Sequence, residues 1–255
     1  RGTWFGVKKR LCLAASALAL LPAPAMAAPP TLQHSIGDPE WVTLSGSSRL
    51  RYEALEGQPR AGLNATDEQL ALRMIITAQV DLQAIKFNAE LHDSRAWLNK
   101  PGGALSANEV NTFELVQANI AGDVNIGGGA KLSLQLGRMT IGLGSRRLVA
   151  ADDYRNATNG YTGLRADLRT KGGLAAMAIY VLPHIRLPDD LPSIKVQQPH
   201  WDRESFDLQL WGGLVSHTGL VRNLTLEAGY FGLLERDWPG HVTRQRDLDS
   251  FSARL

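Results

Sequence analysis

Cysteine is almost absent from this sequence: among 255 residues there is one, Cys12. A lone cysteine cannot form an intramolecular disulfide, and Cys12 lies in a segment that we expect to be removed after export. No lipobox surrounds Cys12, which argues against a lipid anchor. We therefore expect the mature chain to have neither a disulfide nor a catalytic thiol, so an exported fold must be stabilised in another way.

Long hydrophobic runs are missing as well. Residues 28–255 contain no apolar stretch as long as the ~20 residues that a membrane-spanning helix needs. If this part of the chain enters a membrane, it must therefore enter as β-strands.

The N-terminal 27 residues have the three parts of a secretory signal peptide. Residues 8–10 form a positively charged region, residues 11–21 form a short apolar stretch, and Ala25-Met26-Ala27 is a small-x-small cleavage site. These features predict that residues 1–27 direct export and are then removed.

The signal also predicts the boundaries and the charge of the mature chain. We expect residues 1–6 to lie upstream of the true start, with Val7 as an alternative start, or the chain to be a fragment. Residues 28–40 are expected to form a short periplasmic lead, and residues 41–255 the folded part. Four cations and no acid leave with the signal, so the formal net charge of +2 becomes −2. Binding to nucleic acid therefore loses its electrostatic support.

Alternation of apolar and polar residues dominates the rest of the sequence. From Val42 to Ala54 the even positions are apolar or small, and the odd positions are polar or charged. This period of two predicts a strand with two different faces. We expect further strands at 69–82, 85–92, 108–124, 131–136, 164–169, 174–182, 206–210 and 224–230, and a tenth from Asp247.

Three of these segments have features of their own. The alternation in 108–124 changes phase after Leu115, which predicts a β-bulge. Residues 174–182 are apolar on both faces. In 206–210 the apolar face is expected to contain Leu208 and Leu210, opposite Gln209.

The connections between the expected strands alternate between long and short. This pattern is typical of outer-membrane barrels, which have tight periplasmic turns and longer outer loops. The long connections are 56–68, 94–109, 142–159, 183–204 and 236–247, and the short ones are 83–84, 125–130, 170–173 and 217–222. The fourth long connection has four prolines between Pro183 and Pro199, so we expect a semi-rigid lid or plug there.

These patterns predict an all-β fold, a transmembrane antiparallel β-barrel. The alternative is a soluble secreted β-sandwich or β-helix, but the second face remains charged in strand after strand, as in a wet lumen. Bacterial single-chain barrels have even numbers of strands, and the final "FSARL" lacks a terminal aromatic residue. We therefore expect nine to ten N-terminal strands of a larger barrel, truncated at its C-terminal side.

The stretch "GRMTIGLGSRRLVAADDYRN", residues 137–156, resembles the alginate export family of outer-membrane porins. So do "LRYEALEGQPR" (50–60), "AELHDSRAWL" (89–98) and "YVLPHIRLPDD" (180–190). The resemblance implies a monomeric barrel of roughly eighteen strands. It also implies an arginine-lined conduit that passes an anionic polyuronate outward through the lipid and lipopolysaccharide of the outer membrane, with periplasmic export components as further partners.

Guanidinium groups suit a polyuronate because their planar forks carry permanent charge and match carboxylates. A ladder of weak sites would allow entry and exit. The alternative is that the arginines brace the barrel wall in pairs with acids. The expected substrate path comprises Arg49, Arg51, Arg73, Arg138, Arg146, Arg147, Arg155, Arg165 and Arg169, and the expected charge partners are Glu53, Glu90, Asp152, Asp153 and Asp167.

Residues 142–159 leave two interpretations open. If this connection folds inward, Arg146, Arg147 and Arg155 form a cationic constriction that Asp152 and Asp153 brace. Otherwise the same residues form a network at the rim of the barrel.

Catalysis and cofactors have little support in the sequence. There is no G-x-S-x-G motif, and the six histidines lack the spacing of zinc ligands. Calcium at Asp152 and Asp153 or at Asp189 and Asp190 is an alternative, but neither spacing matches a known calcium loop. Three other functions remain open: a general or nutrient-uptake porin, an outer-membrane barrel enzyme, and a secreted polysaccharide-binding protein.

Overall fold

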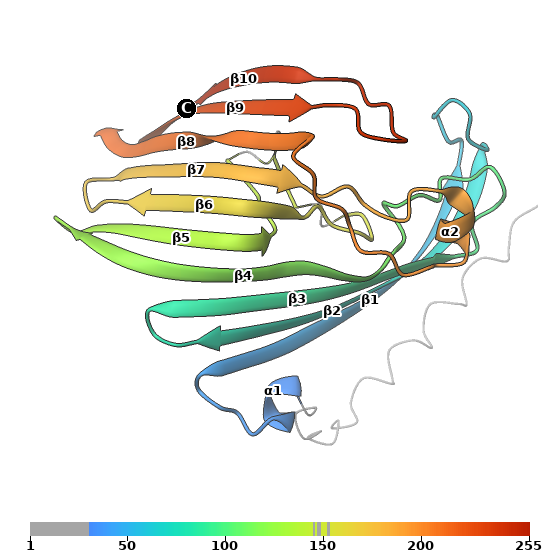
Figure 1. Ribbon diagram of the computed structural model, residues 1–255, viewed down its shortest axis with the longest axis horizontal. Helices are drawn as coiled ribbons and strands as arrows, with labels where there is room; N and C mark the ends of the chain where they lie inside the picture. Colours follow the sequence, from blue (N-terminus) through green and yellow to red (C-terminus); the bar gives the residue numbers. More distant parts are fainter. Residues whose placement is uncertain (1–30, 145, 147–148, 152–153) are drawn as a thin grey trace, which may run out of the picture.

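The protein folds into one antiparallel sheet of ten strands, in which every strand pairs with its neighbours in sequence. The computed structural model describes residues 31–255 except 145, 147–148 and 152–153. The strands are β1 (Val42–Glu56), β2 (Thr66–Asp81), β3 (Ile85–Trp97), β4 (Asn111–Gly127), β5 (Ala130–Met139), β6 (Tyr161–Arg169), β7 (Leu174–Pro183), β8 (Leu208–Val221), β9 (Leu224–Glu235) and β10 (Asp247–Arg254) (Figure 1). The predicted all-β fold and the predicted strand order are confirmed.

Two short helices accompany the sheet. α1 (Leu32–Ser35) precedes β1, and α2 (Leu191–Lys195) lies in the connection between β7 and β8. Thr31 and Asp190 cap these helices, because each side chain accepts a hydrogen bond from a backbone N–H of the first turn. Neither of the described helices has the length and the apolarity that crossing a membrane requires.

The connections lie at opposite ends of the sheet according to their length. Tight turns join β2 to β3, β4 to β5, β6 to β7 and β8 to β9, and all four lie at one end of the sheet (Figure 1, left). The five long connections lie at the other end. β8 continues to Val221, so its turn is shorter than the predicted 217–222.

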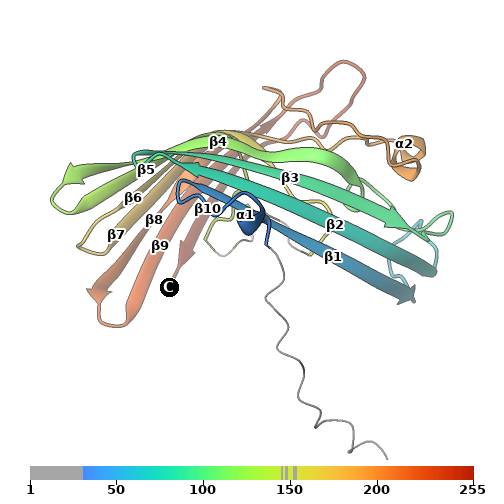
Figure 2. The same ribbon diagram turned by 90° about the horizontal axis from the view of Figure 1, so that it is seen from below.

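The sheet is curved like an arch, with a convex and a concave face (Figure 2). Large apolar side chains point outward on the convex face: Leu50 is 66% exposed, Tyr52 59% and Leu136 60%. A soluble fold would bury such side chains in a core, whereas lipid can cover them. The predicted division of the strands into an apolar and a polar face is therefore confirmed for most of the sheet.

The predicted bulge in β4 is present. Glu90 of β3 pairs with Gln117, and Leu91 pairs with Leu115, so Val116 is the extra residue. Two residues on one strand then oppose one on the other, which bends β4 and restores the alternation beyond it.

β7 and β8 depart from the simple division. The inner face of β7 is apolar because Ile179 and Val181 are buried under the chain that joins β5 to β6. The face predicted for the start of β8 is wrong: Leu210 points inward and is only 8% exposed, whereas Gln209 accepts a hydrogen bond from Tyr180, an exposed residue of the convex face. Leu210 packs against the segment that joins β5 to β6 instead of facing lipid.

Candidate functional site

Residues 140–160 join β5 to β6, and we call them the inner connection. The described residues of this connection, which are all except 145, 147–148 and 152–153, lie beneath the arch (Figure 2). Ile141, Leu143 and Val149 of its first half are buried. They form one apolar cluster with side chains from the neighbouring strands, namely Met139, Tyr161, Ile179, Val181, Leu210 and Phe231. This half is therefore fixed to the inner face of β7, β8 and β9 by hydrophobic packing.

The second half of the inner connection reaches the opposite side of the arch. Arg49 Nη2 donates to the carbonyl oxygen of Arg155 at 3.0 Å, and Arg73 Nη1 donates to the same oxygen at 3.4 Å. Arg51 Nη1 donates to the carbonyl oxygen of Tyr154 at 2.7 Å. Three arginines predicted to lie on the substrate path thus hold the backbone of the inner connection against β1 and β2.

Asn156 anchors the same half and is fully buried. Its Nδ2 lies within 2.8, 3.0 and 2.9 Å of the carbonyl oxygens of Leu72, Arg95 and Glu109. Ser94 donates from its hydroxyl to the carbonyl oxygen of Asn156 at 2.8 Å. One side-chain amide therefore joins the inner connection to β2, to β3 and to the segment before β4.

The remaining residues predicted for this region have different placements. Arg155 donates from Nη1 to Asn108 Oδ1 at 2.8 Å, which ties it to the connection between β3 and β4. Arg146 has a left-handed backbone, with φ of 59°, and its N–H donates to the carbonyl oxygen of Leu143. Arg147, Asp152 and Asp153 lie outside the described residues. The inward fold that a constriction requires is present, and the role of these side chains remains a prediction.

Arg138, another residue of the predicted path, lies at the centre of a second group, the ionic cluster formed with Glu114, His184, Asp202 and Glu204. Nη1 of Arg138 donates to Glu114 at 2.6 Å and to the carbonyl oxygen of Leu115 at 2.8 Å. Nε donates to Glu204 at 2.6 Å, and Nη2 donates to the carbonyl oxygen of Asp202 at 3.1 Å. The side chain of Arg138 is 14% exposed and that of Glu114 is 1% exposed, so this pair is shielded from water.

The ionic cluster holds residues 184–207, the proline-rich connection between β7 and β8. Asp202 accepts a hydrogen bond from Asn111 at 3.0 Å, at the start of β4. Further along, Gln197 donates to the carbonyl oxygen of Ala96 at 2.9 Å, and Ile194 of α2 is buried against Ala96. The proline-rich connection therefore extends from β7 and β8 to the ends of β3 and β4, and its role as a lid or plug remains a prediction.

Two titratable groups of this connection have strongly shifted pKa values. Burial, together with the negative charge of Glu114, raises the pKa of Asp202 to about 7, against the hydrogen bonds from Leu187 and Asn111. Burial, together with the positive charge of Arg138, lowers the pKa of His184 to about 4. At neutral pH the histidine is therefore uncharged, and Asp202 is close to its midpoint.

The two shifts predict opposite effects of pH on stability. The pKa of Asp202 is 3.8 in an ordinary setting and about 7 here, so the folded protein binds more protons between these values and stability falls as pH rises. The pKa of His184 is ordinarily 6.5 and about 4 here, so the unfolded chain binds more protons between these values and stability rises with pH.

In Asp202→Asn only the titration of His184 remains, so the free energy of unfolding should rise from pH 4 to 6.5. In His184→Gln only the titration of Asp202 remains, so the free energy of unfolding should fall from pH 4 to 7. The unchanged protein should have a flatter profile than either variant, because the two titrations oppose each other. Urea unfolding in detergent micelles, measured across this range, checks the signs. Parallel profiles for all three proteins would contradict the assignment.

A third group lines the concave face nearer the tight turns. Arg165, Asp167 and Arg169 of β6 line two adjoining hollows, one of them bounded by Gly142 and Gly144 of the inner connection. Arg165 is paired with Asp167 at 2.6 Å. Arg169 is exposed, and its guanidinium has no hydrogen bond or ion pair within the described residues. The guanidinium of Arg169 therefore faces solvent beside these hollows.

The predicted charge partners are found in different settings. Glu53 lies 3.3 Å from Arg51, and Asp167 pairs with Arg165. Glu90 contacts a histidine, His92, at 2.6 Å instead of an arginine. Two of the three described acids therefore pair with an arginine of the predicted path.

Metal binding has one geometric candidate among the described residues. Glu114, His184 and Asp202 each offer a ligand atom within 4.8 Å of the others. The carboxylate oxygens of Glu114 already accept from Arg138 and from the Asp202 N–H, and Arg138 brings a positive charge. We therefore interpret this group as a hydrogen-bonded ionic network. At the alternative calcium position, Asp190 is engaged as the cap of α2.

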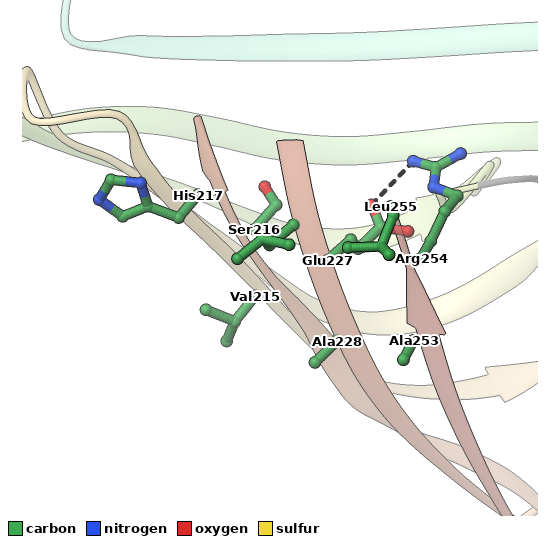
Figure 3. Close-up of a pocket in the computed structure, with 9 residues that line it drawn as sticks. Val215, Ser216, His217, Glu227, Ala228, Ala253, Arg254 and Leu255 are labelled. Atoms are coloured by element: carbon green, nitrogen blue, oxygen red, sulfur yellow. Dashed lines mark hydrogen bonds and ion pairs between the residues drawn. The ribbon is translucent and has the colours of Figure 1, made fainter. Parts of the chain in front are cut away.

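A further hollow lies where β10 ends beside β9 and β8 (Figure 3). Its lining includes Val215, Ala228 and Ala253, together with an ion pair of Arg254 and Glu227 at 3.0 Å. None of the residues predicted for the substrate path lies there, and we assign it no function.

Comparison with known proteins identifies a family for this chain. A comparison with curated proteins finds no match. Among solved structures, the chain is similar to OccK2 (OpdF) of Pseudomonas aeruginosa, with 15% sequence identity and a TM-score of 0.34, over 84% of this chain and 61% of that one. The chain thus spans about three-fifths of that structure. The family model described as alginate export matches residues 40–206, more than half of the sequence, and the chain therefore belongs to the alginate export family.

Proposed function

We propose that this chain forms the wall and the constriction of an outer-membrane porin that conducts an anionic polysaccharide. We propose the polyuronate alginate as its substrate. The observation that carries the proposal is the inner connection, which crosses the concave face from β7–β9 to β1–β2 and narrows the space within the arch. Family membership and the exposed apolar face support a transport channel in the outer membrane rather than an enzyme.

Closure of the sheet into a complete barrel is part of the proposal. β1 and β10 are the outermost strands of the described sheet, and unpaired strand edges are costly in lipid. Further strands that pair with both edges would enclose the concave face as a lumen. The inner connection would then lie inside the lumen as a constriction.

We assign the predicted arginines two roles. Arg49, Arg51 and Arg73 donate to carbonyl oxygens of the inner connection, so their role is to hold the constriction in place. Arg165 and Arg169 line the hollows beneath it. A carboxylate of the polymer can bind Arg169 directly and can compete with Asp167 for Arg165. Weak contacts of this kind allow both entry and release.

Single-channel current through the complete protein in a planar bilayer tests the proposal. The unchanged channel should prefer anions and should be blocked by oligo-uronates. Arg169→Ala should weaken the block about fivefold, because an exposed guanidinium–carboxylate contact contributes up to about 1 kcal/mol. The matched control is Lys171→Ala, which removes the same charge from the neighbouring turn and should leave the block unchanged.

Three results would contradict the proposal in different ways. Conductance without block by oligo-uronates would indicate a general or nutrient-uptake porin. Absence of conductance would favour a barrel enzyme or a polysaccharide-binding protein. Equal loss of block in the arginine variant and the lysine variant would indicate a long-range effect of charge and no direct contact at Arg169.

A further inference from the structure

Tyr154 has an unusual position within the inner connection. Tyr154 is 73% exposed, whereas Asn156 and Ala157, two and three residues further along, are 0% and 1% exposed. Its backbone is nevertheless fixed, since its carbonyl oxygen accepts the bond from Arg51. A large aromatic side chain thus lies at a hydrogen-bonded point of the inner connection and is exposed to the solvent of the concave face.

Contacts with β1 orient the phenol ring. The guanidinium carbon of Arg51 lies 5.0 Å from the ring centroid, a distance at which a cation is attracted to the face of an aromatic ring. The Tyr154 hydroxyl donates to Glu53 Oε1 at 3.3 Å. The ring is therefore positioned by an ion on its face and by a hydrogen bond at its edge, while most of its surface stays accessible.

The surroundings indicate the chemistry of a ligand. The ring offers an apolar surface, and Glu53 and Glu109 beside Arg51 offer acceptors for hydroxyl groups. A pyranose ring has both complementary features: an apolar face of C–H groups and hydroxyls at its edge. A polyanion without sugar rings, such as an oligo-glutamate, has no flat apolar face that could stack on the aromatic ring.

We propose that Tyr154 is a stacking platform for a sugar ring at the constriction, so that the channel recognises the carbohydrate skeleton of its polymer as well as its charge. This inference rests on the proposed function, because it names a second contact of the same substrate. Arg169 binds carboxylates of the polymer, whereas Tyr154 stacks against a sugar ring. Selection between a polyuronate and other polyanions then depends on Tyr154.

The test compares two probes of equal charge in the complete protein in a planar bilayer: an oligo-uronate and an oligo-glutamate of the same length. Tyr154→Ala should shorten the residence time of the oligo-uronate about fivefold, as expected for the loss of one aromatic contact. The residence time of the oligo-glutamate should change much less. Tyr154→Phe, which retains the ring, should restore most of the oligo-uronate residence time. Tyr52→Ala, on the opposite face of β1, is the matched control and should change neither.

The outcomes separate this inference from the proposed function. Equal shortening for both probes in Tyr154→Ala would overturn the inference, because the side chain would then act only through the charges of Arg51 and Glu53. An unchanged oligo-uronate residence time in Tyr154→Ala, with the block still weakened by Arg169→Ala, would overturn the inference alone. Absence of block in the unchanged protein would overturn the proposed function and this inference with it.

Discussion

Arg138→Ala is expected to lower the free energy of unfolding by about 3–5 kcal/mol, because removing one partner leaves buried charge without compensation. Glu114 would lose its ion pair while its side chain remains 1% exposed, and Glu204 would lose the same donor. The carbonyl oxygens of Leu115 and Asp202 would lose a hydrogen bond as well. Urea unfolding in detergent micelles, followed by tryptophan fluorescence, measures the change.

Two further variants make this result specific. Arg138→Lys retains the charge, but an ammonium group cannot reach four acceptors in the geometry of a guanidinium, so an intermediate loss is expected. Lys131→Ala breaks the exposed pair with Asp123 and should cost less than about 1 kcal/mol. A loss in Arg138→Ala as small as that in Lys131→Ala would show that water screens the ionic cluster after all.

Asn156→Ala is expected to release the second half of the inner connection and to raise the open-channel conductance of the complete protein. The side-chain amide is the shared donor to carbonyl oxygens of Leu72, Arg95 and Glu109, and each lost hydrogen bond typically costs about 0.5–1.5 kcal/mol. Loss of this anchor should also increase current noise, since the connection can then sample several positions. Single-channel recording in a planar bilayer checks both effects.

The controls for Asn156 use the same chemistry. Asn156→Asp has the same shape but places carboxylate oxygens against carbonyl oxygens, so its effect should be at least as large as that of Asn156→Ala. Asn159→Ala removes an amide whose bond among the described residues is to Ala150, within the inner connection, and should leave the conductance close to that of the unchanged channel. Equal conductance in all four proteins would mean that Asn156 does not hold the constriction.

The arrangement of strands was predictable from the sequence because it depends on local information. Alternation identifies a strand from its own residues, and the lengths of the connections assign them to the two ends of the sheet. The bulge in β4 was predictable for the same reason, since the phase of the alternation changes within one segment. These features need no knowledge of which distant residues meet.

The candidate site was only partly predictable. Arg49 and Tyr154 are about a hundred positions from their partners in the sequence, and no local pattern indicates that a guanidinium will bond a carbonyl oxygen of the inner connection. Glu114 and Asp202 were not predictable as site residues, because isolated acids are common in any sequence. Only the fold brings them to Arg138.

One sequence signal for the inner connection was available. β7 is apolar on both faces, and an inner face of a wet lumen is apolar only where something covers it. The same reasoning explains Leu210 at the start of β8. A strand with two apolar faces in an otherwise alternating sheet therefore predicts a segment packed beneath it, although it does not identify that segment.

The inner connection also has a mechanical consequence. Its first half is fixed to β7–β9 by packing, and its second half is fixed to β1–β2 by hydrogen bonds. It is therefore a cross-link across the concave face that resists separation of these two groups of strands. Hairpins between neighbouring strands need only contacts that are close in sequence. The cross-link instead joins residues about a hundred positions apart, and forming such contacts is a slow step in folding. Once these contacts have formed, they help to set the curvature of the ten strands.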